Sequence, residues 1–283
     1  MASSLELLII DPQNDFCDLP EDLLPRSAGL RPALPVPGAH ADLQRVSTLI
    51  RAADRALSGI TVTLDTHQRV DIAHPTFWCT GGGTAVAPFT PITASDVRAK
   101  RFVPRRSEHL GRVLAYLDAL EKLGRYTLMV WPIHCELGTW GHNVHPAVQA
   151  ACQAWEEAHA ENVTHVLKGQ NPWTENYSAL LAEVPLDDDP ATQLNRGLID
   201  RLDAVERLLI CGEASSHCVR ATTEHLVANL ADPTPQRLSR ITLLTDCMSP
   251  VAGFETQHAE FLAGMAARGL SLSTSGDVLA ALG

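Results

Sequence analysis

Six short apolar runs, each ending in a polar residue or a turn, predict the strands of this protein. They are Leu5–Ile10, Ile60–Leu64, Tyr126–Trp131, Val163–Leu167, Leu208–Cys211 and Ile241–Thr245. Because nearly every position in these runs is apolar, we expect both faces of each strand to be buried, as in a parallel sheet.

Segments with helical spacing of apolar residues separate the predicted strands. They are Ala41–Leu57, Leu110–Leu123, Pro146–Ala158, Leu198–Ala204, Val219–Ala231 and Glu255–Ala267. Strands that alternate with helices indicate the α/β class, and right-handed crossovers place helices on both faces of the sheet. We therefore predict a three-layer α/β/α sandwich with a mainly parallel, doubly wound, six-stranded sheet. Gly81–Lys100, rich in Gly, Pro and Thr, is interpreted as a long loop or insertion.

Composition narrows the class of protein. Apolar residues make up 45% of the 283 positions, enough for a sizeable core, and the net charge of −11 argues against a nucleic-acid groove or an anionic membrane as partner. No apolar run approaches the roughly 18–20 residues of a membrane span. The first residues lack the basic segment of a signal peptide. Seven scattered cysteines are typical of reduced thiols, so we expect a cytoplasmic protein.

Polar residues follow several of the predicted strands. In a doubly wound sheet, ligands bind beyond the carboxyl ends of the strands. Asp11, Asp65, His134, Lys168 and the segment 212–218 all occupy such positions. Asp246 does too, so position alone does not select the functional residues.

Cys218 is the candidate nucleophile. It lies where a predicted helix begins, and a helix N-terminus stabilises a thiolate and offers free backbone N–H groups to an oxyanion. A lone cysteine at such a place is more often a small core residue. Asp11 and Lys168, at two other strand ends, change that balance: the carboxylate would take the thiol proton, and the ammonium would keep the carboxylate ionised.

A second group of residues suits a divalent metal ion. Asp65 and His67 are two positions apart at a strand end, His74 follows in the next loop, and His134 follows a later strand. One carboxylate and three imidazoles suit Zn²⁺, with Mn²⁺ and Fe²⁺ as alternatives. A closed, structural zinc site that uses Cys135 or Cys79 is the rival interpretation.

Six motifs, in order along the chain, resemble those of nicotinamidases, members of the isochorismatase-like superfamily of cysteine hydrolases. They are Asp11-Pro-Gln-Asn-Asp-Phe16, Asp65-x-His67, Trp131-Pro-Ile-His134-Cys-x-x-Gly-Thr139, Lys168-Gly169, Tyr177-Ser178-Ala179 and Gly212-x-Ala214-x-x-x-Cys218-Val219. The resemblance extends from residue 5 to about residue 225, and the Asp-x-His and Trp-Pro-x-His pair is similar to the metal-containing branch.

The resemblance implies a catalytic triad of Asp11, Lys168 and Cys218 that hydrolyses a small carboxamide, such as nicotinamide, to an acid and ammonia. Cys218 would attack the amide carbon, and Asp11 would act as general base and then acid. The resemblance further implies that the backbone N–H groups of Ala214 and Cys218 form the oxyanion hole, after a cis peptide bond before Ala214. Phe16 and Trp131 would enclose a planar ring, whose nitrogen the metal would ligate.

The sequence also departs from the family pattern. We predict one domain of residues 1–283 with an insertion at about 79–125, next to the metal-binding loop. Glu213 and Ser216 replace more usual residues beside the nucleophile, and a carboxylate at position 213 must be paired or exposed. Two alternatives therefore stay open: a metal-independent carbamoyl or ureido hydrolase, and an inactive ligand-binding member. Superfamily members are often oligomeric, so a homo-oligomer is compatible with the resemblance.

Overall fold

Six parallel strands form the central sheet of the protein. The computed structural model describes residues 4–25 and 29–283. In spatial order the sheet strands are β10 (Ser271–Ser273), β9 (Ile241–Leu244), β8 (Arg207–Gly212), β1 (Leu5–Ile10), β2 (Gly59–Asp65) and β7 (Thr164–Lys168). Every pairing among them is parallel. The predicted α/β fold with a doubly wound, six-stranded sheet is confirmed.

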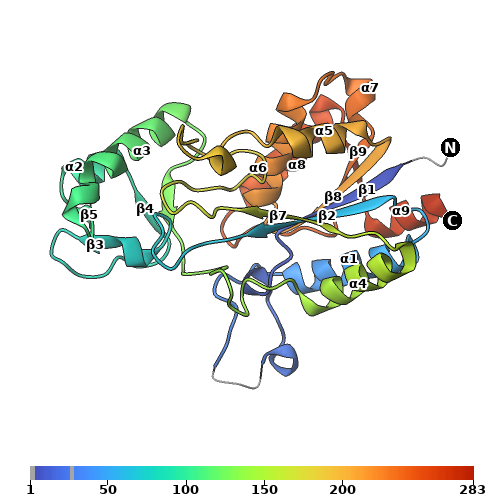
Figure 1. Ribbon diagram of the computed structural model, residues 1–283, viewed down its shortest axis with the longest axis horizontal. Coiled ribbons are helices and arrows are strands. Elements are labelled where there is room, and N and C mark those ends of the chain that lie inside the picture. Colours follow the sequence, from blue (N-terminus) through green and yellow to red (C-terminus); the bar gives the residue numbers. More distant parts are fainter. Residues whose placement is uncertain (1–3, 26–28) are drawn as a thin grey trace.

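The chain reverses its winding direction between β1 and β8. From β1 it moves outward to β2 and β7, then returns to β8 and continues to β9 and β10 (Figure 1). Ile10 pairs with Gly212 at this switch point, so the segments that follow β1 and β8 diverge from one place. Such a divergence opens the crevice in which doubly wound proteins bind ligands.

Helices cover both faces of the sheet (Figure 1). One face packs against α1 (Ala39–Ala52), α4 (Pro146–His159) and α9 (Ser275–Leu282), and the other against α5 (Arg196–Ala204), α6 (Cys218–Asn229), α7 (Pro235–Leu238) and α8 (Glu255–Arg268). Along β1, Leu7 and Ile9 pack toward α1, whereas Leu8 and Ile10 pack toward α6. This alternation explains the uninterrupted apolar sequence of the strand, because side chains of successive residues enter opposite layers.

A lobe at one end of the sheet has its own apolar cluster, which includes Trp78, Ile92, Val113 and Leu117 (Figure 1). It contains β3 (Trp78–Thr80), β4 (Thr90–Ile92), α2 (Ala94–Arg98), β5 (Phe102–Pro104), α3 (Leu110–Leu123) and β6 (Leu128–Val130). The segment that the sequence predicts as a loop, 81–100, therefore includes a strand and a capped helix: the Thr93 hydroxyl and the Asp96 carboxylate form a capping box at the start of α2.

The prediction that the run Tyr126–Trp131 forms a strand of the central sheet is wrong. The run Tyr126–Trp131 yields β6, which pairs antiparallel with β4 in the lobe and does not join the sheet. The sixth sheet strand is instead β10, which has three residues, two of them serines. An apolar run predicts that a strand is buried but not which strand it pairs with, and a short polar strand gives no such signal.

No helix within residues 4–25 and 29–283 combines the length and the hydropathy that crossing a membrane requires.

Gly212 is expected to be intolerant of any side chain. Its φ is +112°, and a Cβ there would overlap the backbone of Ile10 across the switch point. We predict that Gly212→Ala lowers the free energy of unfolding by about 2–4 kcal/mol. In the control Gly264→Ala, where a Cβ meets open space in α8, stability should rise by up to about 1 kcal/mol. Urea unfolding followed by circular dichroism measures both, and equal effects would contradict the steric argument.

Candidate active site and metal cluster

Asp11, Lys168 and Cys218 meet at the carboxyl ends of β1, β7 and β8. The ammonium of Lys168 lies 3.0 Å from Asp11 Oδ2 and 3.6 Å from Cys218 Sγ. It also lies 2.8 Å from Asp65 Oδ1 and donates a hydrogen bond of 2.8 Å to the carbonyl of Asn176. The structure thus brings together the three side chains that the sequence assigned to a triad, with Lys168 between two carboxylates.

The backbone conformation of Asp11 and its hydrogen bonds to Thr63 orient its carboxylate. Asp11 has a φ of +43°, in the left-handed region that non-glycine residues rarely adopt. Its N–H donates to the Thr63 carbonyl at 3.1 Å, and its Oδ1 accepts a hydrogen bond of 2.5 Å from the Thr63 hydroxyl. The Gln13 side chain then joins this turn to β2, because it donates to the Asp65 carbonyl and accepts from the Asp65 N–H, each at 2.8 Å.

Lys168 and the carboxylates of Asp11 and Asp65 each shift the pKa of the other toward the charged form. Burial and the neighbouring Asp65 raise the pKa of Asp11, whereas Lys168 lowers it; the net direction is upward. Burial alone would lower the pKa of Lys168, but Asp11 and Asp65 raise it well above its ordinary value. The amine therefore stays protonated. An elevated pKa suits Asp11 to accept a proton and release it again.

Cys218 begins α6, as predicted, but its thiol is not activated as predicted. Burial, together with the charges of Asp11 and Asp65, raises the pKa of the thiol well above its ordinary value, although Lys168 opposes the shift. Desolvation and two carboxylates outweigh the helix N-terminus, so the resting residue is a thiol. A thiol that attacks must lose its proton to a base, and Asp11 is the carboxylate joined to the sulfur through the Lys168 ammonium.

Ala214 and Cys218 both line one cavity. Within residues 4–25 and 29–283, neither of their backbone N–H groups donates a hydrogen bond to the protein. The Glu213–Ala214 peptide bond is cis. Free N–H groups at the start of a helix are the usual partners of an oxyanion.

A small cavity gives access to the sulfur. Apolar side chains form most of its wall, and Asp65, His134 and Glu175 add polar groups at one end. The apolar residues include Phe16 and Trp131, the two predicted ring-binding residues, together with Leu34, Tyr177 and Val251. The cavity is narrow, because the space that can hold the centre of a water molecule is only about 20 Å³. Trp131 is held in place by a hydrogen bond of 3.1 Å from its indole N–H to the Tyr177 hydroxyl.

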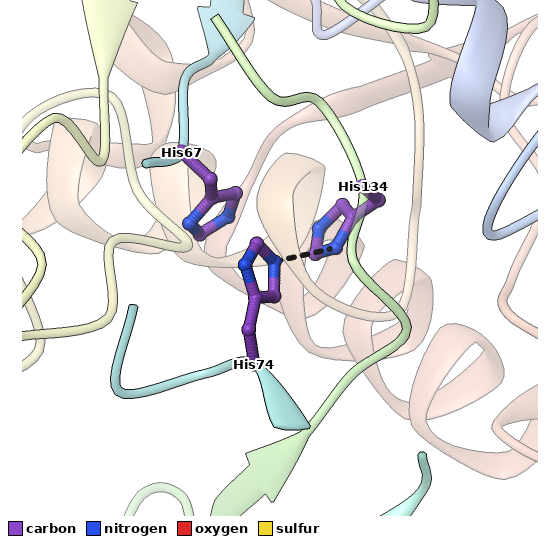
Figure 2. Close-up of side chains that lie close together, drawn as sticks. All are labelled: His67, His74 and His134. Carbon is purple, nitrogen blue, oxygen red and sulfur yellow. Dashed lines mark hydrogen bonds between the residues drawn. The ribbon is translucent and has the colours of Figure 1, made fainter. Parts of the chain in front are cut away.

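The three predicted histidine ligands point toward one another (Figure 2). The ring nitrogens of His67, His74 and His134 that would hold an ion all lie within 4.8 Å of one another. Asp65 completes the group, because its Oδ2 lies 3.1 Å from His67 Nε2 and 3.3 Å from His134 Nε2. The predicted ligand set therefore converges, and Asp65 also contacts Lys168.

Hydrogen bonding and burial within this cluster fit a metal ion. His67 Nδ1 contacts Asp71 Oδ2 at 3.1 Å, and His134 Nδ1 donates to the Pro132 carbonyl at 2.8 Å, which leaves the Nε2 atoms of both rings toward Asp65. Burial and the adjacent His67 and His134 lower the pKa of His74 to about 2, so its imidazole is neutral, the form that binds metals. The buried His74 Nδ1 has no hydrogen-bond partner among the described residues.

The rival zinc site is not assembled. Cys135 and Cys79 are absent from the ligand cluster found in the described part of the chain. The N–H of Cys135 donates to Asp15 Oδ2 at 2.7 Å, and Cys79 lies in β3 of the lobe.

Sequence reasoning missed several supporting residues. Gln13 and Thr63 link the strand ends, Asp71 orients His67, and Glu175 places a carboxyl without a partner on Oε2 beside the cavity. Two signals were available: Thr63 lies two positions before Asp65 on one strand face, and Asp71 lies four positions after His67.

A larger groove of about 440 Å³ adjoins the cavity and shares Trp131, Tyr177 and His217 with it. Residues 124–127, which follow α3 of the lobe, line one side of this groove, and Arg220 and Phe254 line another. The lobe thus contributes to the surroundings of the cavity, although the triad comes from the sheet.

Lys168→Met is expected to destabilise the protein strongly, because Asp11 and Asp65 would be left buried without their cation. Loss of one partner from a buried ionic group typically costs about 3–5 kcal/mol. Lys122→Met, at an exposed position on α3, should change the free energy of unfolding by less than about 0.5 kcal/mol. Chemical denaturation of both variants tests the difference. Similar midpoints would mean that Lys168 does not compensate these carboxylates.

No protein-family model and no curated protein sequence matches the chain.

Comparison with solved structures gives matches over the whole chain. A nicotinamidase/pyrazinamidase of Acinetobacter baumanii has a TM-score of 0.62 at 17% identity, and each chain covers 98% of the other. The yeast nicotinamidase bound to the inhibitor nicotinaldehyde has a TM-score of 0.63 at 19% identity, covering 95% of this chain and 99% of its own. The pyrazinamidase of Pyrococcus horikoshii in complex with zinc has a TM-score of 0.52 at 20% identity, covering 96% and 99% respectively.

Isochorismatase-like hydrolases are also among the matched chains. At these identities the comparisons bear on the fold, and they agree with the resemblance drawn from the six motifs. The chain therefore has the fold shared by nicotinamidases and isochorismatase-like hydrolases.

Proposed function

We propose that the protein is a cysteine amidohydrolase that converts a small ring carboxamide, such as nicotinamide, to the acid and ammonia through a thioester on Cys218. One observation carries the proposal: the Lys168 ammonium contacts both Asp11, at 3.0 Å, and the Cys218 sulfur, at 3.6 Å, behind a small cavity. A structural role alone does not account for a buried thiol, acid and amine in contact beside unused backbone N–H groups.

In the first half-reaction, Asp11 takes the thiol proton as the Cys218 sulfur attacks the amide carbon. The N–H groups of Ala214 and Cys218 donate to the oxygen, which becomes negative in the tetrahedral intermediate. Asp11 then returns the proton to the leaving nitrogen, the carbon–nitrogen bond breaks, and ammonia departs. Lys168 remains protonated throughout and stabilises Asp11 while it is ionised.

In the second half-reaction, Asp11 takes a proton from water, whose oxygen attacks the thioester carbon. The same N–H groups hold the second oxyanion. The carbon–sulfur bond breaks, the sulfur regains the proton from Asp11, and the carboxylic acid leaves. One group serves as base and acid in both halves, which requires the raised pKa that burial gives Asp11.

Asp65, His67, His74 and His134 would hold a divalent metal ion, which is Zn²⁺ on ligand type. Such an ion would ligate a ring nitrogen of the substrate and orient the ring. The zinc complex of the Pyrococcus horikoshii pyrazinamidase supports this assignment. Phe16 and Trp131 would contact the two faces of that ring.

The alternatives differ from this proposal in one feature each. A metal-independent carbamoyl or ureido hydrolase would use the triad without the histidines, and an inactive ligand-binding member would use neither. The buried histidine cluster with its Asp71 partner favours the metal-containing form.

The seven cysteines, none of them in a disulfide, support a cytoplasmic location.

Cys218→Ala should abolish ammonia release from nicotinamide, pyrazinamide or whichever ring amide is cleaved. Loss of a nucleophile that acts together with its base typically lowers kcat by about 10⁴-fold or more. Cys152→Ala, which removes a buried thiol from α4 on the opposite face of the sheet, is the matched control and should retain activity. A coupled ammonia assay with single-turnover trapping of the thioester measures both variants.

Two results separate the parts of this proposal. Activity retained in Cys218→Ala would refute the mechanism. Cleavage of other amides, with nicotinamide untouched, would refute only the substrate.

Asp71→Asn should weaken metal binding, because His67 would lose the carboxylate that orients its ring. Removal of such a supporting group typically costs about 10–100-fold in affinity. Asp118→Asn, at an exposed ion pair with Arg98, should leave the affinity unchanged. Titration of Zn²⁺ against a chelating dye gives the affinities. A purified protein that holds no transition metal by elemental analysis and binds none would refute the metal-containing form and favour the metal-independent hydrolase.

A further inference from the structure

Glu213 carries a buried carboxyl group at the turn between β8 and the nucleophile. It is 0% exposed, and among the described residues no base pairs with it. Its Oε2 accepts a hydrogen bond of 3.2 Å from the Ser249 N–H, and its Oε1 receives none from the described residues. The same Ser249 donates its hydroxyl to Asp42 on α1, which is 5% exposed, so one residue holds both buried carboxyl groups.

The two carboxyl groups differ in their other contacts. Asp42 Oδ1 accepts a hydrogen bond of 2.9 Å from Arg45, and Asp42 Oδ2 accepts one of 2.5 Å from the Ser249 hydroxyl. Among the described residues, Glu213 contacts no cation. Two ionised carboxylates only accept hydrogen bonds, so placing them together is favourable when one retains its proton. Burial raises the pKa of Asp42 as well, but the Ser249 hydroxyl and Arg45 oppose that shift, so we place the charge on Asp42 and the proton on Glu213.

The turn that contains Glu213 is fastened to the segment after β9. Three hydrogen bonds involve its backbone or its serine side chain: Gly212 N–H to the Cys247 carbonyl at 2.9 Å, Ser215 N–H to the Ser249 carbonyl at 2.9 Å, and Val251 N–H to the Ser216 hydroxyl at 3.1 Å. The Glu213 side chain adds a fourth at Ser249 and extends the connection to α1 through Asp42. Ala214, directly after Glu213, and Val251 both line the catalytic cavity.

We propose that Glu213 is a positioning residue, whose neutral carboxyl group shares one proton with Asp42 and thereby fixes the turn that presents the Ala214 N–H and the Cys218 thiol. The shared proton is a property of the folded chain. Its consequence for catalysis rests on the proposed amidohydrolase function.

Other titratable groups face this pair from every element packed around it. Asp18 adds a third negative charge, Arg45 is the cation, and His258 on α8 contacts the Ser215 hydroxyl at 2.7 Å. Burial lowers the pKa of His258, so it is neutral above mildly acidic pH. Burial also raises the pKa values of the neighbouring thiols, Cys17, Cys211 and Cys247, which are therefore uncharged. Within residues 4–25 and 29–283, no further cation balances an ionised Glu213.

Burial, followed by the charge of Asp42, raises the pKa of Glu213 well above its ordinary 4.5. Between 4.5 and the raised value, the folded protein binds a proton that the unfolded chain releases. The stability that this proton provides is complete below 4.5 and is lost as pH rises through the folded-state pKa. Glu213→Gln, which mimics the neutral acid, escapes that loss.

Thermal unfolding at pH 5 and pH 9 tests the shared proton. The Tm of Glu213→Gln relative to the wild type should rise by at least about 3 °C between the two pH values. Glu206→Gln, at an exposed position after α5, should show no such change. In an Asp42→Asn background the rise should become smaller, because the charge of Asp42 is removed and the asparagine amide can donate to an ionised Glu213, while the effect of burial remains. A Tm difference that is the same at both pH values overturns the shared proton.

Catalysis and thiol accessibility test the positioning role at pH 7. Glu213→Ala should lower kcat for a cleaved amide by at least about tenfold with KM within about threefold, because an oxyanion-hole donor is displaced, and Glu213→Gln should restore kcat. If no amide is cleaved, the amidohydrolase function fails while a second readout still decides the role. Iodoacetamide should alkylate the Cys218 peptide at least about fivefold faster in Glu213→Ala than in the wild type or Glu213→Gln. If Glu213→Ala has the same kcat and the same alkylation rate as the wild type, the positioning role is overturned. It is also overturned if Glu213→Gln is as impaired as Glu213→Ala.

Discussion

The ammonium of Lys168, buried between Asp11 and Asp65, is the interaction on which the site depends. An ionised carboxylate is costly to bury, and two of them beside one another are more so. Lys168 contacts both at 3.0 Å or less, and His67 Nε2 lies 3.1 Å from Asp65 Oδ2. The carboxyl ends of β1, β2 and β7 must therefore stay in register, since a shift of one residue in any strand would separate a charge from its partner.

The same ion group determines how the nucleophile can work. Burial and two nearby carboxylates keep Cys218 protonated at rest, which differs from enzymes that stabilise a thiolate before the substrate binds. In the proposed mechanism, the helix N-terminus would therefore act on the oxyanion that develops during the reaction, and Asp11 would remove the thiol proton. Asp65 connects this chemistry to the histidine cluster, because one carboxylate contacts both Lys168 and His67. Occupation of the cluster and the charge state of the triad are thus electrostatically linked.

Sequence patterns predicted the fold and the strand-end residues well, because both depend on local composition. Leu5–Ile10 is predicted with its observed bounds, since a continuous apolar run followed by Asp11 specifies a buried strand and its end. The sequence did not predict which strands pair with one another: Tyr126–Trp131 has the composition of a sheet strand but pairs within the lobe. The contact between Glu213 and Asp42 was inaccessible for the same reason, as it joins distant segments that only the packing of α1 against the sheet brings together.

Two pairs of buried carboxyl groups lie beside the turn that leads to Cys218: Asp11 with Asp65, and Glu213 with Asp42. The repulsion between the two carboxyl groups is reduced in a different way in each pair. Asp11 and Asp65 share a cation, so both carry charge in the resting site, and one is available to take a proton from the thiol. Glu213 and Asp42 have a single, half-exposed Arg45 that reaches only Asp42, so a proton must neutralise the other. In the proposed mechanism, Asp11 would change its protonation during turnover while Glu213 would not. This arrangement would keep the backbone N–H groups of the turn fixed while charge moves through the site.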